Sequence, residues 1–158
     1  MTSRDNTSNN GSTGIAKLPV AAAVVALVGL ADAVYLTVHH YTAEPVPCGA
    51  DFDCGAVLSS SYAEIAGIPL AAFGAAAYFV AFSLALLTAF GDRRMWGIFG
   101  IQTIIMSAFS AWLIYVQAAI IGAFCQYCLI SALTTFTLYT LYLVSRFLNR
   151  PSSDISTA

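Results

Sequence analysis

Charged residues are the class that this sequence lacks most. Six of the 158 residues are Lys or Arg and eight are Asp or Glu, so charged residues make up 9% of the chain. A typical soluble domain carries about 25%. A surface with so few charges cannot keep a chain of this length in water, which excludes an ordinary soluble enzyme. The scarcity of Lys and Arg also excludes a nucleic-acid binder, because phosphate recognition needs clustered basic side chains.

Long apolar segments take the place of the missing charges. Hydrophobic residues make up 59% of the chain, and the mean hydropathy is +0.78. Four apolar runs reach the roughly 20 residues that a helix needs to cross about 30 Å of hydrocarbon. They are Leu18–Val38, Ile68–Phe90, Met95–Ile121 and Leu129–Leu148. The sequence therefore predicts an all-α integral membrane protein, a four-transmembrane-helix bundle with a long loop, His39–Gly67, between its first two helices.

The two ends of the chain differ from this middle part. Residues 1–17 are rich in Ser, Thr, Asn and Gly, and we expect them to form a disordered tail. Residues 18–148 form the expected four-helix domain, and residues 149–158 form a second tail. The segment Leu18–Leu30, followed by small residues, also has features of a cleavable signal peptide. The apolar run continues past the cleavage site, however, which favours a transmembrane helix.

The basic residues indicate how the bundle is oriented in the membrane. They fall in the N-terminal tail, in the turn between the second and third helices, or at the C-terminal end. They are Arg4, Lys17, Arg93, Arg94, Arg146 and Arg150. Because basic residues concentrate on the cytoplasmic side, both termini and that turn are predicted to be cytoplasmic. The loop His39–Gly67 and the corner Gly122–Cys128 then face outward.

All four cysteines lie on the predicted outer side. Cys48 and Cys54 are in the first loop, and Cys125 and Cys128 form a C-x-x-C motif at the start of the fourth helix. Disulfides form and persist in oxidising compartments outside the cytoplasm. The segment that follows Cys54 mixes apolar residues with serines, and it suits a short interfacial helix that covers the mouth of the bundle.

The spacing of the C-x-x-C motif gives its two thiols different surroundings. Three residues at a rise of 1.5 Å separate them by about 4.5 Å along the helix axis, on one face. At the helix start, free N–H groups and the helix dipole favour the thiolate of Cys125, which is the nucleophilic form. Cys128 lies one turn deeper. Such a pair can exchange with a loop cysteine on one side and meet an apolar electron acceptor on the other.

Two simpler interpretations of the cysteines stay open. The chain can be a structural tetraspan protein with two static disulfides, Cys48–Cys54 and Cys125–Cys128. A C-x-x-C motif can also form half of a zinc site. The loop pair has five intervening residues, however, and the site would straddle a membrane corner, so we expect no metal.

Other polar residues within or near the apolar runs are weaker candidates. Inserting an ionised Asp at mid-bilayer costs about 2.5–3.5 kcal/mol of free energy, so Asp32 should face the interior of the bundle or the membrane interface. There it either orders the catalytic mouth, relays a proton or makes a structural contact. His39 and His40 follow the first run, and we expect them at the interface rather than as haem ligands.

Together the cysteines and their neighbours resemble the bacterial branch of the vitamin K epoxide reductase family. The similarity covers about residues 18–148 and includes Asp32, Tyr35 and Leu36 in the first helix. Its other motifs are Cys48-x5-Cys54, Val57-Leu58-Ser59-Ser60, Gly67-Ile68-Pro69-Leu70 and Gly122-Ala123-Phe124-Cys125-x-Tyr127-Cys128.

The resemblance implies a relay of electrons to a quinone, either ubiquinone or menaquinone. A reduced thioredoxin-fold partner would form a mixed disulfide with Cys48. Cys54 would then exchange with Cys125, and Cys128 would pass electrons to the quinone. The resemblance also implies a hydrogen bond from Ser60 to a quinone oxygen. It places the active site on the periplasmic side of a bacterial inner or plasma membrane, where the relay supports disulfide bond formation.

The sequence departs from its relatives in two respects. Many bacterial relatives carry a fused thioredoxin-like domain, whereas this chain ends at Ala158, so we expect a separate partner protein. Animal enzymes carry Asn and Tyr in the pocket where Leu70 and Ala132 stand here. These substitutions favour a plain quinone over the alternative substrate, vitamin K epoxide.

Overall fold

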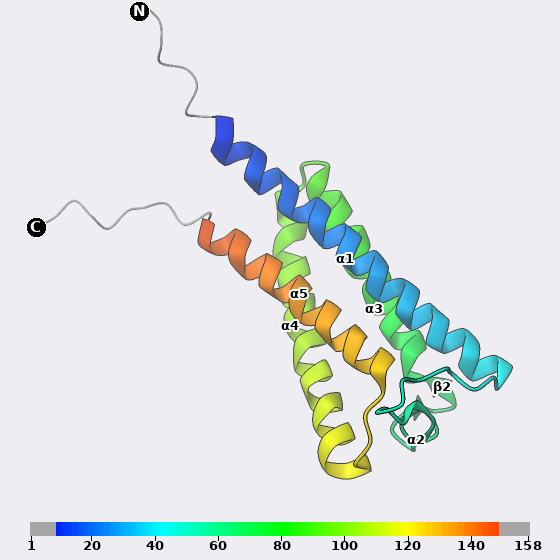
Figure 1. Ribbon diagram of the computed structural model, residues 1–158. Helices are drawn as coiled ribbons and strands as arrows, with labels where there is room; N and C mark the ends of the chain where they lie inside the picture. The colour runs from blue at the N-terminus through cyan, green and yellow to red at the C-terminus, as the bar shows by residue number, and fades with distance from the viewer. Residues whose placement is uncertain (1–8, 149–158) are drawn as a thin grey trace, which may run out of the picture.

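The computed structural model describes residues 9–148, so residues 1–8 and 149–158, which belong to the two expected tails, lie outside the described residues. The chain is mostly helical (Figure 1). The long helices are α1 (Asn9–Thr42), α3 (Leu70–Ala89), α4 (Arg93–Tyr115) and α5 (Gln126–Leu148). A π-helical segment, Val116–Ile121, continues α4.

Among the described residues, four helices are long and apolar enough to cross a membrane, which agrees with the four predicted apolar runs. In the described part of the chain, α1 packs against α3 and α5, and α4 packs against the same two helices. The four helices therefore form a closed ring, with α1 and α4 on opposite sides.

Two of the expected helix boundaries differ from the observed ones. Helix α1 begins at Asn9, before the predicted start at Leu18, and α5 begins at Gln126, before Leu129. An apolar run marks the part of a helix that suits lipid, whereas the helical backbone can continue into polar residues beyond that run. Part of the expected N-terminal tail, residues 9–17, is therefore helical.

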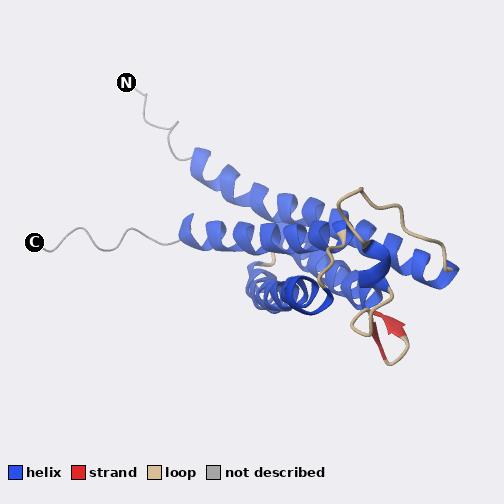
Figure 2. Ribbon diagram, turned by 60° about the horizontal axis from the view of Figure 1, so that its bottom comes forward, coloured by secondary structure: helices blue, strands red, loops and turns tan. Residues whose placement is uncertain are grey.

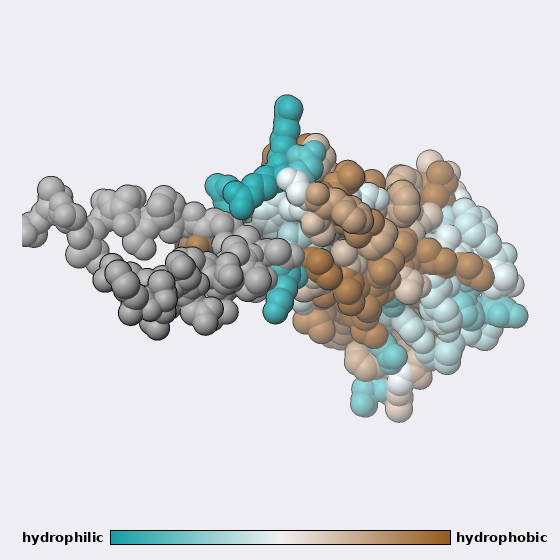
Figure 3. Space-filling model, turned by 90° about the horizontal axis from the view of Figure 1, so that it is seen from above, coloured by the Kyte–Doolittle hydropathy of each residue, from teal (hydrophilic) through white to brown (hydrophobic). Residues whose placement is uncertain are grey.

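Much of the outer surface is apolar. Large exposed hydrophobic side chains occur on all four long helices, for example Val24 on α1, Phe79 on α3, Ile105 on α4 and Leu133 on α5. Figure 3 shows hydrophobic residues over the middle of the visible face and hydrophilic residues at its margins. A surface of this kind fits a multi-pass membrane protein whose solvent is lipid.

The connection between α1 and α3 has structure of its own. It contains the short helix α2 (Cys54–Leu58) and a small antiparallel hairpin of β1 (Glu64–Ile65) and β2 (Ile68–Pro69) (Figure 2). The two hairpin turn residues have positive φ angles, 54° and 81°, the second at a glycine. The predicted interfacial helix is thus limited to α2.

Small residues allow α1 and α3 to approach closely. The buried core between them contains Ala22, Ala26 and Ala81, and the Tyr78 side chain lies against Gly29. A Cβ atom at Gly29 would overlap the Tyr78 ring. The Tyr78 hydroxyl is in turn hydrogen-bonded to α5, so the ring has little room to move.

We therefore expect Gly29→Ala to lower the free energy of unfolding by about 1–3 kcal/mol, because the added methyl group must displace the Tyr78 ring. The measurement is an unfolding titration with SDS in mixed micelles. Gly97→Ala in α4 is the matched control, since a Cβ atom there meets open space. Equal stability of the two variants would contradict this account of the α1–α3 packing.

Candidate functional site

The structure brings the four cysteines into one cluster. Cys54 and Cys125 are buried in contact with Val57, and Cys48 and Cys128 pack against this group. Cys54 is the first residue of α2, Cys125 immediately precedes α5, and Cys128 lies within the first turn of α5. Two cysteine pairs that are far apart in the sequence are therefore adjacent in space.

The two pairs are in different redox states. Cys48 and Cys54 form a disulfide, with their Cα atoms 6.2 Å apart. Cys125 and Cys128 are free thiols. The cluster thus holds one disulfide beside one dithiol, which is the arrangement that thiol–disulfide exchange requires.

The start of α5 activates Cys125. The backbone N–H of Cys128 donates a hydrogen bond to the Cys125 Sγ atom at 3.4 Å. The hydrogen bond from the Cys128 thiol, assisted by nearby backbone N–H groups, lowers the pKa of Cys125 from 9.0 to about 7, although burial opposes this shift. Cys125 therefore forms its thiolate more readily than an ordinary cysteine does.

The corner that precedes α5 is built on Gln117, a residue for which no functional role was predicted. Gly122 has a φ angle of 70°, which ends the π-helical segment in a left-handed turn. The Gln117 carbonyl accepts hydrogen bonds from the N–H groups of Gly122 at 2.9 Å and Ala123 at 3.2 Å. Its side-chain Oε1 accepts the N–H of Cys125 at 2.9 Å. Gln117 thus fixes the position of the first motif cysteine.

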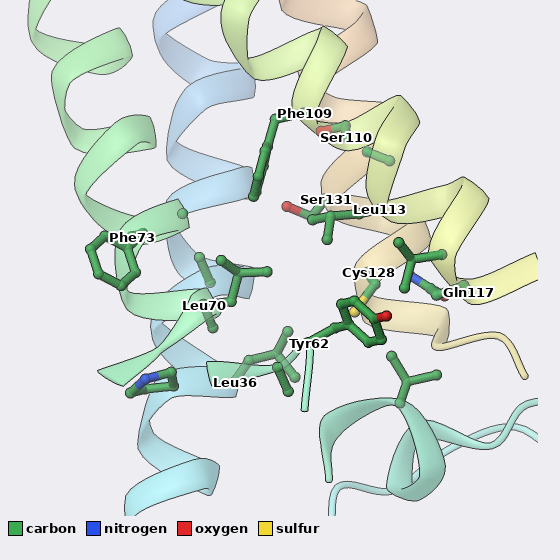
Figure 4. Close-up of a pocket in the computed structure, with 18 of the residues that line it drawn as sticks. Leu36, Tyr62, Leu70, Phe73, Phe109, Ser110, Leu113, Gln117, Cys128 and Ser131 are labelled. Atoms are coloured by element: carbon green, nitrogen blue, oxygen red, sulfur yellow. The ribbon is translucent and has the colours of Figure 1, made fainter. Parts of the chain in front are cut away.

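A largely apolar cavity of about 320 Å³ lies beside the cysteine cluster, enclosed by the four long helices and by the segment after Cys54 (Figure 4). Cys128 lines this cavity, whereas Cys125 lies in the buried cluster with Cys54. The two thiols of the motif therefore have different surroundings. Most of the described residues that line the cavity are apolar, and the polar side chains besides Cys128 are Asp32, His40, Ser60, Tyr62, Tyr78, Ser110, Gln117, Ser131 and Thr135.

Three residues selected from the sequence as possible pocket groups also line this cavity: Ser60, Leu70 and Ala132. The Ser60 hydroxyl donates a hydrogen bond to the Val57 carbonyl at 2.7 Å. A hydroxyl that donates in this way still has oxygen lone pairs free to accept, and it must rotate to donate to a ligand.

Asp32 lines the cavity as well, so it faces the interior of the bundle. Its Oδ2 atom is buried and has no hydrogen-bond partner among the described residues. A buried carboxylate oxygen without a partner is costly, so it calls for a functional explanation.

The histidines lie at the end of α1. The ring of His40 is 3.3 Å from a Glu64 carboxylate oxygen in β1, which links the helix to the hairpin. The ring of His39 packs against the ring of Tyr35 at a tilt of 54°, with the ring centroids 4.4 Å apart. Within the described residues, no group of three or more His, Cys, Asp or Glu side chains could hold a metal ion.

The sequence model of the vitamin K epoxide reductase family matches residues 20–143 of this chain. The chain belongs to this family. The resemblance predicted from the sequence is therefore confirmed, and the match covers all of α3 and α4, most of α1 and α5, and the cysteine cluster. A curated relative is the thiol-disulfide oxidoreductase LTO1 of Arabidopsis thaliana, which is 32% identical over 119 residues. That alignment covers 70% of this chain and 32% of LTO1, so the chain spans about a third of the length of this relative.

The hydrogen bond between the two thiols predicts a shift in the titration of Cys125. The thiolate of Cys125 should form at a lower pH than the thiolate of an ordinary cysteine and should be lost as the pH falls through this lowered pKa. In Cys128→Ala the midpoint should rise toward 9, because the thiol donor is gone. The measurement is thiolate absorbance at 240 nm, taken as the difference from Cys125→Ala. A midpoint that Cys128→Ala leaves unchanged would contradict this cause.

Proposed function

We propose that the protein is a membrane thiol–quinone oxidoreductase. It reoxidises a thioredoxin-fold thiol oxidase and passes the electrons to a quinone, which supports disulfide bond formation outside the cytoplasm. The single observation that carries the proposal is the arrangement of the cysteines. A disulfide and a dithiol share one cluster, and one thiol of that dithiol, Cys128, lines an apolar cavity. Family membership and the name of the Arabidopsis relative support an oxidoreductase role.

The electrons enter at the loop disulfide. A thiolate of the reduced partner attacks Cys48, breaks the Cys48–Cys54 bond and releases the Cys54 thiolate. Cys54 attacks Cys125 in the oxidised motif and releases the Cys128 thiolate. The second partner thiol then attacks the partner sulfur of the mixed disulfide, so the partner leaves oxidised and Cys48 is free. Cys48 attacks Cys54, which restores the loop disulfide and releases Cys125.

These exchanges end with an oxidised loop and a reduced motif, which is the state of the structure. Closing the Cys125–Cys128 disulfide then releases two electrons and two protons, which convert one quinone to one quinol. Cys128 is the thiol that meets the acceptor, because it lines the cavity. Cys125, which lies in the cluster with the loop cysteines, is the second sulfur of that disulfide.

The cavity fits a quinone head group. Ligand sites are mostly apolar with a few well-placed polar groups, and their volumes begin at about 300 Å³. This cavity, of about 320 Å³, has that character. Ser60 lines the cavity, and its hydroxyl would rotate away from the Val57 carbonyl to donate a hydrogen bond to a ring oxygen of ubiquinone or menaquinone. Leu70 and Ala132 add no polar group to the lining, which favours a plain quinone over vitamin K epoxide.

We place the cysteine cluster on the periplasmic side of a bacterial inner or plasma membrane, with both termini in the cytoplasm. The α3–α4 turn, which precedes Arg93 and Arg94, and the cysteine-bearing segments lie at opposite ends of the bundle (Figure 1). Basic residues mark the cytoplasmic end. The partner would then meet Cys48 in an oxidising compartment.

The structural alternative required two static disulfides. Because Cys125 and Cys128 lie in one cluster with the Cys48–Cys54 disulfide, the arrangement favours exchange over two separate fixed crosslinks.

We expect Cys128→Ala to lower quinone reduction by about 10³-fold or more, because the thiol that meets the acceptor is removed. The measurement is quinone absorbance with purified protein in detergent and a reduced thioredoxin-fold oxidase as donor. Thr140→Ala, on an exposed part of α5, is the control. Full turnover in Cys128→Ala, or none by wild type with either quinone, would refute the proposed reaction.

Asp32 is the one acidic side chain among the described residues that line the cavity, and we propose that it passes a proton to the acceptor. Asp32→Asn should slow quinone reduction about 10²-fold, the usual size of an acid–base contribution. Asp32→Glu should recover part of the rate.

Neither substitution of Asp32 should affect the formation of a Cys54–Cys125 disulfide, because that exchange does not need the proton that Asp32 passes to the acceptor. If Asp32→Asn slows the exchange and the quinone step equally, Asp32 has a structural role instead.

A further inference from the structure

The two middle residues of the C-x-x-C motif, Gln126 and Tyr127, bind the loop that carries the other cysteine pair. The Gln126 Oε1 atom accepts a hydrogen bond from the backbone N–H of Gly49 at 3.2 Å. The Tyr127 hydroxyl donates to the Pro47 carbonyl at 3.0 Å. Pro47 and Gly49 are the two sequence neighbours of Cys48, so both sides of this cysteine are attached to the start of α5.

The Cys54 end of the loop is attached to the same corner. The backbone N–H of Asp53 donates to the Phe124 carbonyl at 3.0 Å. The Asp53 side chain also caps α2 by accepting the N–H of Ala56 at 2.9 Å, which fixes the first residue of that helix, Cys54. Each loop cysteine is thus next to a residue that is bonded to the segment around Cys125.

Tyr127 is itself held in place by α1. The centroids of the Tyr127 and Tyr35 rings are 5.3 Å apart, and the Tyr35 ring in turn contacts the ring of His39. The direction of the Tyr127 hydroxyl is therefore set by a long helix of the bundle rather than by the loop that it binds. A donor fixed in this way orders the loop, because little side-chain entropy is lost when the bond forms.

We propose that Gln126 and Tyr127 are positioning residues that hold the Cys48–Cys54 loop on Cys125 and so raise the effective concentration of Cys54 at Cys125. The inference rests on the proposed function, since it assumes that Cys54 and Cys125 exchange. It adds a role for the two middle positions of the motif: their side chains order the loop and take no part in electron transfer.

The experiment uses Cys48→Ser/Cys128→Ser, which leaves Cys54 and Cys125 as the cysteines of the chain. In a glutathione redox buffer, the fraction of Cys54–Cys125 disulfide gives the effective concentration of one thiol at the other. In this background Gln126→Met and Tyr127→Phe should each lower that concentration about fivefold, the effect of losing one ordinary hydrogen bond. The disulfide is quantified by mass spectrometry after alkylation of free thiols.

Two controls separate positioning from a general disturbance of the fold. Gln126→Glu keeps an oxygen that accepts the Gly49 N–H, so it should retain the parent value. Tyr115→Phe removes the hydroxyl of an exposed tyrosine at the end of α4 and should also have no effect.

The possible outcomes distinguish the inference from the function on which it rests. Equal disulfide formation in the parent, Gln126→Met and Tyr127→Phe would overturn the positioning role and leave the relay intact. An equal loss in Gln126→Glu and Gln126→Met would also overturn it, because the accepting oxygen would then not matter. If the parent forms no Cys54–Cys125 disulfide, the relay itself is wrong.

Discussion

Backbone polar groups at the edge of a hydrocarbon layer must find partners within the protein, and the corner between α4 and α5 meets this requirement. Gln117 accepts three N–H groups there, two with its carbonyl and one with its side chain. Phe124 accepts a fourth N–H, from Asp53 in the loop. These bonds give the backbone N–H groups of the turn their hydrogen-bond partners, and they also hold Cys125 against the loop cysteines. The adjacency of the two cysteine pairs depends on this corner.

The same corner separates two chemical environments within one motif. Cys125, at the helix start, is surrounded by N–H donors and by the loop, whereas Cys128 lies one turn further on and lines an apolar cavity. Thiol exchange needs an available thiolate, and a quinone needs a dry pocket. The geometry of a single helical turn therefore connects a polar exchange site with an apolar acceptor site.

The sequence predicted the features that depend on composition and spacing. Four apolar runs gave the four long helices, and C-x-x-C spacing placed Cys125 and Cys128 at the start of α5. The role of Gln117 could not be predicted, because it depends on a π-helical segment and a left-handed glycine that tertiary contacts decide. The bonds of Gln126 and Tyr127 were hidden for a similar reason, since their partners are backbone groups of a distant loop.

The most direct test of the electron path is a single turnover with a reduced partner, quenched at intervals with an alkylating agent. The pairing of the four cysteines is mapped by mass spectrometry at each time, while quinone absorbance is followed in parallel. The account predicts that a Cys54–Cys125 disulfide appears first and decays before the quinone is reduced. Quinone reduction without any Cys54–Cys125 species would contradict it.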